Sequence, residues 1–207
     1  MLETLSIDPR IKLGKDSIRD LLATPKVVRV NSFDDEAVKS FSTAMSAAHQ
    51  TGQPVIPVII DSNGGEAYSL MAMVDIIDAS TVPVATIIEG KGFSCGAVLF
   101  CCGNAGMRYM GPNSTLMIHD VLSADENMKK SGEIMSDAQE TSRINKRLYR
   151  IIDRHIGKPA GHTWNLVQSR SRTDWYLNPK QAVKHGFANH VKVPVMKCHV
   201  KIEVEFG

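Results

Sequence analysis

Apolar positions in the first half of the chain alternate between short β-branched runs and helical stretches. The runs 27–30, 54–60 and 83–88 predict buried strands. Helical spacing over 34–49 and 66–79, and an apolar stretch over 95–102, predict helices between and after these strands. Two more short strands are expected at 107–110 and 115–118, on either side of Gly111-Pro112-Asn113. Strands that alternate with helices in this way predict an α/β fold with crossover connections.

The second half of the chain has a different pattern. A long helical stretch of mixed charge covers 127–156 and is closed by Gly157-Lys158-Pro159. Shorter helices are predicted at 160–169 and 179–185. From Val195 to Phe206 apolar and charged residues alternate, which predicts a strand with one solvated face. No linker or internal repeat interrupts the sequence, so a single domain over 1–207 is expected.

Composition and charge narrow the possible partners. The 207 residues carry 24 basic and 22 acidic side chains, a net charge of +2, which gives no basic footprint for nucleic acid or membrane lipid. No apolar run approaches the ~20 residues of a membrane span, and the N-terminus lacks the apolar stretch of a signal peptide. A cytoplasmic protein without nucleic-acid or membrane partners is therefore expected.

Four cysteines, Cys95, Cys101, Cys102 and Cys198, are present. Three of them lie in one apolar stretch, and their spacing is neither that of a disulfide framework nor that of a zinc site. The sequence therefore predicts reduced thiols in the core, with no bound metal and no cofactor.

Two glycine-marked turns follow predicted strands at the carboxyl edge, where open α/β sheets bind ligands. The first is Asn63-Gly64-Gly65, which is either a ligand-facing backbone turn or a plain tight turn. The second runs from Gly92 to Gly96 and places Ser94 near the start of a buried helix. There free N–H groups favour developing negative charge, so Ser94 is a candidate nucleophile. The alternative is an ordinary serine N-cap.

A serine nucleophile needs a base, and His119 is the best placed of seven histidines. It follows the apolar strand 115–118 and stands beside Asp120. A purely structural histidine is the alternative. Most of the other six are expected to be solvated or surface residues: His49, His155, His162, His185, His190 and His199.

Four blocks together give a resemblance to a known family. They are Val58 to Gly65 (VIIDSNGG), Gly92 to Gly103 (GFSCGAVLFCCG), Arg108 to His119 (RYMGPNSTLMIH) and Asp174 to Gly186 (DWYLNPKQAVKHG). In content, in order, and in the 25-residue separation of serine and histidine, the chain resembles the proteolytic subunit of the Clp protease, the ClpP family. The likeness extends from about Val27 to Val193.

The resemblance implies a role for each matching residue. Ser94 matches the nucleophile, His119 the general base and Asp174 the third member of a catalytic triad. The backbone N–H groups of Gly65 and Cys95 match the oxyanion hole. Because Cys95 would contribute its backbone, its side chain is not expected to be a nucleophile.

The resemblance also implies a fold and an assembly. The fold is a spiral of β-β-α units with a protruding helical handle at 120–157, an axial segment at 1–26 and a C-terminal extension at 195–207. The implied enzyme is an ATP-dependent serine endopeptidase for unfolded proteins and peptides, working inside a heptameric ring. No P-loop is present, so an AAA+ unfoldase partner would hydrolyse ATP. No cleaved propeptide is expected.

Two departures from the family pattern concern ring stacking. The segment 120–127 contains no glycine, and Thr173 precedes the acid where the family commonly has arginine. A stacked double ring is expected, with a single ring as the alternative.

Other functions remain open at this point. An α/β-hydrolase-type esterase could use the same G-x-S-x-G with Asp174 and either His185 or His190. A crotonase-like acyl-CoA enzyme shares the implied fold but rarely needs all three triad residues. A catalytically silent subunit of a mixed ring is the third alternative, although such subunits typically lose a triad residue.

Overall fold

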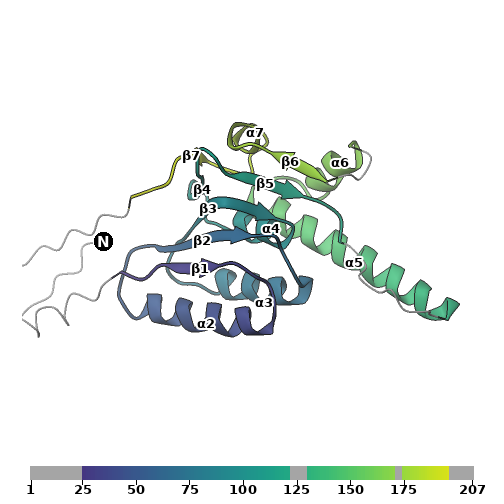
Figure 1. The fold of residues 1–207 in the computed structure, drawn as a ribbon, viewed down its shortest axis with the longest axis horizontal. Coiled ribbons are helices and arrows are strands. Elements are labelled where there is room, and N and C mark those ends of the chain that lie inside the picture. The colour runs from purple at the N-terminus through teal and green to yellow at the C-terminus, as the bar shows by residue number, and fades with distance from the viewer. Residues whose placement is uncertain (1–24, 122–129, 171–173, 196–207) are drawn as a thin grey trace, which may run out of the picture.

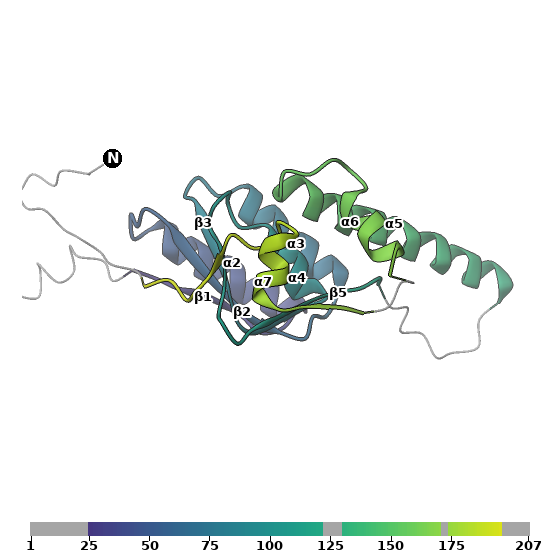
Figure 2. The ribbon, with the colours of Figure 1, turned by 90° about the horizontal axis from the view of Figure 1, so that it is seen from above.

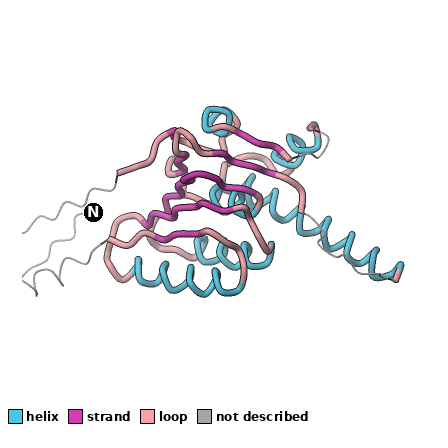
Figure 3. Tube along the Cα trace, in the orientation of Figure 1, coloured by secondary structure: helices cyan, strands magenta, loops and turns pink. Residues whose placement is uncertain are grey.

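Helices pack around one mainly parallel sheet in the computed structural model, which describes residues 25–121, 130–170 and 174–195 (Figures 1 and 3). In Figure 3 the strands run side by side through the middle of the body. The elements in chain order are β1 (Val28–Val30), α2 (Asp35–His49), β2 (Ile56–Ser62), α3 (Ala67–Asp78), β3 (Val84–Phe93), α4 (Cys95–Cys101), β4 (Arg108–Met110), β5 (Thr115–Ile118), α5 (Ser131–His155), α6 (His162–Gln168), β6 (Trp175–Leu177), α7 (Pro179–Lys184) and β7 (His190–Val191).

The sheet has seven strands in the described residues, and its main path runs β1-β2-β3-β4-β7. Every pair along this path is parallel. Strand β5 pairs in parallel with β3, and β6 pairs antiparallel with β5. Helices α2 and α3 lie together along one side of β1 and β2 (Figure 1). The α/β class predicted from alternating strands and helices is confirmed.

Strand β3 pairs with two different strands along its length. Its residues Thr86 to Ile88 pair with β4, and its residues Lys91 to Phe93 pair with β5. The register against β2 shifts between the two parts, and Gly90 has a φ of 86° there. The prediction that this strand ends at Ile88 was wrong. Gly90 and Gly92 predict a turn, but in the structure this part of the chain forms a bulge, after which the strand continues toward Ser94.

Strands β6 and β7 were missed by the sequence analysis. They contain three and two residues, too few for a periodic signal, and both form by pairing with strands distant in sequence. The strand predicted for 195–206 lies outside the described residues except for Val195, and most of the axial segment 1–26 lies outside them as well. Cys198 and His199 are also outside them.

The core centres on α4, whose seven residues are all buried. Amphipathic α2 buries Phe41, Met45 and Ala48 against the body. Its N-terminus is capped by the Asp34 side chain, which accepts a 2.8 Å hydrogen bond from the Ala37 amide. The described cysteines, Cys95, Cys101 and Cys102, are buried free thiols, as predicted.

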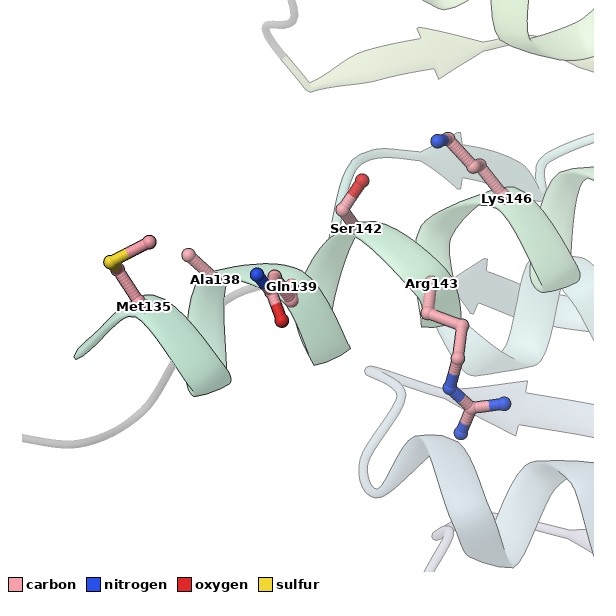
Figure 4. Close-up of a pocket in the computed structure, with 6 residues that line it drawn as sticks. All are labelled: Met135, Ala138, Gln139, Ser142, Arg143 and Lys146. Carbon is pink, nitrogen blue, oxygen red and sulfur yellow. The ribbon is translucent and has the colours of Figure 1, made fainter. Parts of the chain in front are cut away.

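Helix α5 extends well beyond the sheet, as Figures 1 and 2 show. Its first two turns are almost wholly exposed, whereas Ile144, Leu148 and Ile152 near its base are buried. Figure 4 looks at the exposed part, where side chains from Met135 to Lys146 line a shallow hollow of about 550 Å³. None of the helices in the described residues combines the length and apolar character needed to cross a membrane.

The Arg108 side chain in β4 forms hydrogen bonds with both the base of α5 and the loop after α7. Its buried guanidinium donates to the carbonyl oxygens of Phe187 (2.8 Å), Gly103 (3.2 Å), Gly186 (3.2 Å) and His155 (3.4 Å). Burial lowers the pKa of this guanidinium from its usual value. One side chain therefore binds three backbone segments around the end of the sheet.

Candidate active site

Strand register brings three residues distant in sequence to one edge of the sheet. Phe93 at the end of β3 is paired with Met117 in β5, so Ser94 follows the first strand as His119 follows the second. Ile118 in β5 is paired antiparallel with Trp175 in β6, which sets Asp174 opposite His119. The three predicted site residues therefore meet because three neighbouring strands end or begin together there.

The side chains of these three residues are in contact. His119 Nε2 lies 2.8 Å from Ser94 Oγ, and His119 Nδ1 lies 3.3 Å from Asp174 Oδ1. The imidazole is 13% exposed and the Asp174 side chain 51% exposed. The contact with Asp174 is longer than the 2.7–2.9 Å of a strong charge-assisted hydrogen bond, and it is open to solvent. The hydroxyl, the imidazole and the carboxylate thus lie in the order of nucleophile, base and orienting acid that acyl transfer requires.

Ser94 has an unusual backbone conformation. With φ 54° and ψ −119°, it is the only non-glycine residue with positive φ in the described part of the chain. Its side chain makes no capping hydrogen bond to α4, so the alternative of an ordinary N-cap serine is wrong. A strained turn from strand to helix holds the Ser94 hydroxyl toward His119, a geometry also found at the nucleophile elbow of α/β-hydrolases.

The Gly64-Gly65 turn passes close to Ser94. Both glycines have positive φ, 106° and 155°. A Cβ atom on Gly64 would lie 2.7 Å from Ser94 Cβ, and one on Gly65 would lie 2.5 Å from the Phe33 carbonyl oxygen. No larger residue fits either position without displacing backbone, so the turn needs both glycines.

The two amides matched to the oxyanion hole belong to segments that touch each other beside Ser94. The Cys95 thiol donates a 3.2 Å hydrogen bond to the carbonyl oxygen of Gly65. Cys95 is also the first residue of α4, so its amide has no acceptor within the helix. Burial raises the pKa of the Cys95 thiol to about 11, which argues against a nucleophilic role for its sulfur.

Helix α5 holds the segment that follows His119. The Tyr149 hydroxyl donates a 2.7 Å hydrogen bond to the Asp120 carboxylate, and the Asn145 side-chain oxygen accepts a 2.7 Å hydrogen bond from the Val121 amide. Burial is the main cause that raises the pKa of the Tyr149 hydroxyl, and the hydrogen bond to Asp120 raises it further. Sequence reasoning missed both residues, and the one available signal was a polar Asn145 within the buried stripe of α5.

The other described histidines are elsewhere. His185 packs edge-on against Trp175 at 4.9 Å between ring centroids, and His190 stacks on Tyr109 at 4.8 Å. The structure therefore brings His119, rather than the histidines of the esterase alternative, to the Ser94 hydroxyl.

The remaining histidines that the structure describes are all partly exposed, as expected of surface residues: His49, His155, His162, His185 and His190. Some of them also accept or donate hydrogen bonds, for example between His49 Nδ1 and the Met45 carbonyl oxygen at 2.8 Å.

Among the described residues, no group of three or more His, Cys, Asp or Glu side chains is positioned to hold a metal ion.

Comparison with known proteins adds an independent finding. A family model described as Clp protease matches residues 11–194 of the chain. The "ATP-dependent Clp protease proteolytic subunit" of Porphyromonas gingivalis (strain ATCC BAA-308 / W83) is 31% identical over 136 residues, which is 66% of this chain and 59% of the relative. The aligned region therefore spans less than two thirds of the relative's length.

Proposed function

Because this chain belongs to the Clp protease family, we propose that it is a serine endopeptidase that hydrolyses peptide bonds of unfolded proteins and short peptides. The observation that carries the proposal is the 2.8 Å contact between His119 Nε2 and Ser94 Oγ. A histidine at this distance can remove the hydroxyl proton as the oxygen attacks.

Acylation follows from this geometry. Ser94 Oγ forms a bond to the carbonyl carbon of the scissile peptide while His119 Nε2 takes its proton. Asp174, 3.3 Å from Nδ1, keeps the imidazole proton on that nitrogen and stabilises the imidazolium. His119 then gives the proton to the leaving amine, and the peptide C–N bond breaks. Water activated by His119 next attacks the acyl-enzyme and restores the Ser94 hydroxyl.

The oxyanion of the tetrahedral intermediate would accept hydrogen bonds from the amides of Gly65 and Cys95. Donors of this kind each contribute a factor on the order of 10²–10³ to kcat, because they are fixed before the charge develops. The two positive-φ glycines and the strained Ser94 backbone support this role, since they bring both backbone segments beside the hydroxyl.

The assembly is part of the same proposal. The chain would form a heptameric ring, stacked in pairs through the handle at 120–157, with the active sites inside the chamber. An AAA+ unfoldase in the cytoplasm would deliver unfolded substrate, because the chain itself contains no P-loop. The name of the Porphyromonas gingivalis relative, which includes "ATP-dependent", supports this partnership.

A fluorogenic short-peptide assay combined with size-resolved mass measurement tests the proposal. The wild type should cleave the peptide and migrate as a multiple of seven chains. Ser94→Ala should lose cleavage while keeping the same assembly mass, and Ser46→Ala, an exposed serine in α2, should keep both. Cleavage retained by Ser94→Ala would contradict the proposed nucleophile.

A further inference from the structure

A pocket of about 300 Å³ lies between α5 and the start of α6. Its lining residues are Lys146, Tyr149, Arg150, Ala160, Gly161 and Trp164. The lining combines two cationic side chains, one turn apart on α5, with two aromatic rings. Lys146 leaves α5 on the side away from Arg143, which extends in the opposite direction (Figure 4).

Hydrogen bonds and ring contacts hold part of the pocket's lining in place. The buried Asp153 carboxylate accepts hydrogen bonds from the Gly161 amide (2.8 Å), the Thr163 amide (2.9 Å) and the Thr163 hydroxyl (2.6 Å). Tyr149 and Trp164 meet edge to face with 5.6 Å between ring centroids. The backbone and rings around the pocket are therefore held in place before anything binds.

The pocket carries two cationic side chains. Within the described residues neither Lys146 nor Arg150 forms an ion pair, whereas Arg143 on the same helix is paired with Glu140. Two acids adjoin the lining: Asp153 is 1% exposed with its oxygens bound by Gly161 and Thr163, and Asp120 accepts the Tyr149 hydroxyl. An anion that enters the pocket would therefore meet two cations that have no ion-pair partner in the described part of the chain.

The pocket adjoins the proposed active site through α5. Tyr149 lines the pocket and also binds Asp120, the residue next to His119. Lys146 lines it as well, and its neighbour Asn145 binds the Val121 amide. A peptide held at Ser94 and His119 therefore has a cationic pocket beside the segment that carries the base.

We propose that this pocket receives an acidic side chain of the peptide substrate, with Lys146 and Arg150 as specificity-determining residues. The inference rests on the proposed peptidase function and adds a preference to it. The cations would attract the carboxylate, and the rings of Tyr149 and Trp164 would contact the methylene groups that carry it.

Paired substrates test the preference. Fluorogenic peptides that differ only by Glu or Gln would be compared, with the substitution moved through the positions flanking the scissile bond. At one or more positions the wild type should favour Glu by about three- to fivefold in kcat/KM, the range of a partly exposed ion pair. The preference should weaken as ionic strength rises.

Charge-removal variants supply the decisive comparison. Lys146→Gln/Arg150→Gln should bring the Glu to Gln ratio of kcat/KM to about one. Lys39→Gln/Lys180→Gln removes the same charge from exposed sites on α2 and α7 and should keep the wild-type ratio. The ratio is the readout, because it is insensitive to the amount of active enzyme.

The possible results distinguish the proposed acidic subsite from the proposed peptidase function. A wild type that cleaves both peptides equally at every position, or a ratio that survives in Lys146→Gln/Arg150→Gln, would overturn the acidic subsite alone. A wild type that cleaves neither peptide would contradict the peptidase function itself, and the subsite with it. A changed assembly mass in the double variant would assign the two cations to subunit contacts and overturn the proposal.

The carboxylate could also come from the new C-terminus of a cleaved fragment. Peptide acids and their amides, tested as inhibitors, distinguish this source. One outcome would contradict an acidic side chain as the ligand. In it, the peptide acids inhibit more strongly than the amides, the double variant loses this difference, and Glu and Gln substrates are cleaved equally. The pocket would then bind the C-terminus of the product.

Discussion

The amide of Ser94 donates a 2.9 Å hydrogen bond to the carbonyl oxygen of Met117. This bond continues the β3–β5 pairing one residue beyond the end of β3, and it joins the proposed nucleophile to the strand that ends just before His119. The distance between hydroxyl and imidazole is therefore set by backbone pairing as well as by side-chain rotamers. Substitutions at these positions should change the chemistry more than the fold.

His119→Ala should abolish labelling of Ser94 by a fluorophosphonate. Without the imidazole 2.8 Å away, the hydroxyl has no base to remove its proton. Labelling would be followed by mass spectrometry of the peptide that contains Ser94. His190→Ala, which removes a ring stacked on Tyr109, should still be labelled. The opposite pattern would favour an esterase that uses His190.

Ser94→Gly should be more stable than Ser94→Ala, by about 1 kcal/mol in the free energy of unfolding. Alanine keeps the strain of φ 54°, whereas glycine adopts such angles freely. The relief of strain in the glycine variant outweighs the larger conformational entropy that glycine gives the unfolded chain. Urea unfolding of the two variants at equal protein concentration measures the difference. The same pair at Ser46 in α2 should show the reverse order, because alanine favours helix. Equal stability at position 94 would mean that the turn is unstrained.

Asp174→Asn should lower kcat by about a hundredfold, less than the ~10⁴-fold typical of a buried triad acid. The effect should be smaller because the carboxylate is half exposed and 3.3 Å from His119 Nδ1, so it holds the imidazole less firmly. Steady-state kinetics on a short peptide would measure it, with Asp75→Asn, at an exposed position of α3, as the control. A loss below twofold would remove Asp174 from the mechanism.

Tyr149→Phe should lower kcat several-fold with a smaller change in KM. The variant loses the 2.7 Å hydrogen bond to Asp120, worth about 1 kcal/mol, and thereby loosens the segment that positions His119. Asp120→Asn keeps an acceptor for the tyrosine hydroxyl and should be affected less. Identical kinetics for Tyr149→Phe and wild type would contradict the positioning role.

Cys95 should resist alkylation by iodoacetamide at pH 8, although it adjoins the proposed nucleophile. With a pKa of about 11, only about one thiol in a thousand is ionised at that pH. Alkylation mapped by mass spectrometry should be about two orders of magnitude slower than in the urea-unfolded chain, whose thiol has an ordinary pKa near 8.5. It should accelerate as the pH rises toward 11. Rapid labelling at pH 8 would point to an exposed thiolate.

Much of the fold could be predicted from hydrophobic periodicity. Helix α2 was predicted over 34–49 and runs from Asp35 to His49, because a capping aspartate and a terminal glycine bound a clear apolar stripe. The strands that were missed or cut short, β6, β7 and the second half of β3, owe their structure to partners far away in sequence. Local hydrophobic patterns in the sequence do not predict such long-range strand pairing.

The candidate site was predicted in part. The resemblance to ClpP identified Ser94, His119 and Asp174, and the structure brings their side chains together. The contacts of Tyr149 and Asn145 could not be predicted, because they join α5 to residues 24 to 29 positions earlier through hydrogen bonds that no spacing rule describes. The strained backbone of Ser94 was likewise invisible, since serine is an ordinary residue at a helix start.

The two-part pairing of β3 suggests a use in protein engineering. The exposed turn at Pro112 and Asn113 lies between β4 and β5, which pair with different halves of that strand. A chain divided there would carry Ser94 on one fragment and both His119 and Asp174 on the other. Peptide cleavage would then report that the fragments had reassembled, so this scaffold could serve as a split reporter whose signal requires β5 to dock onto β3.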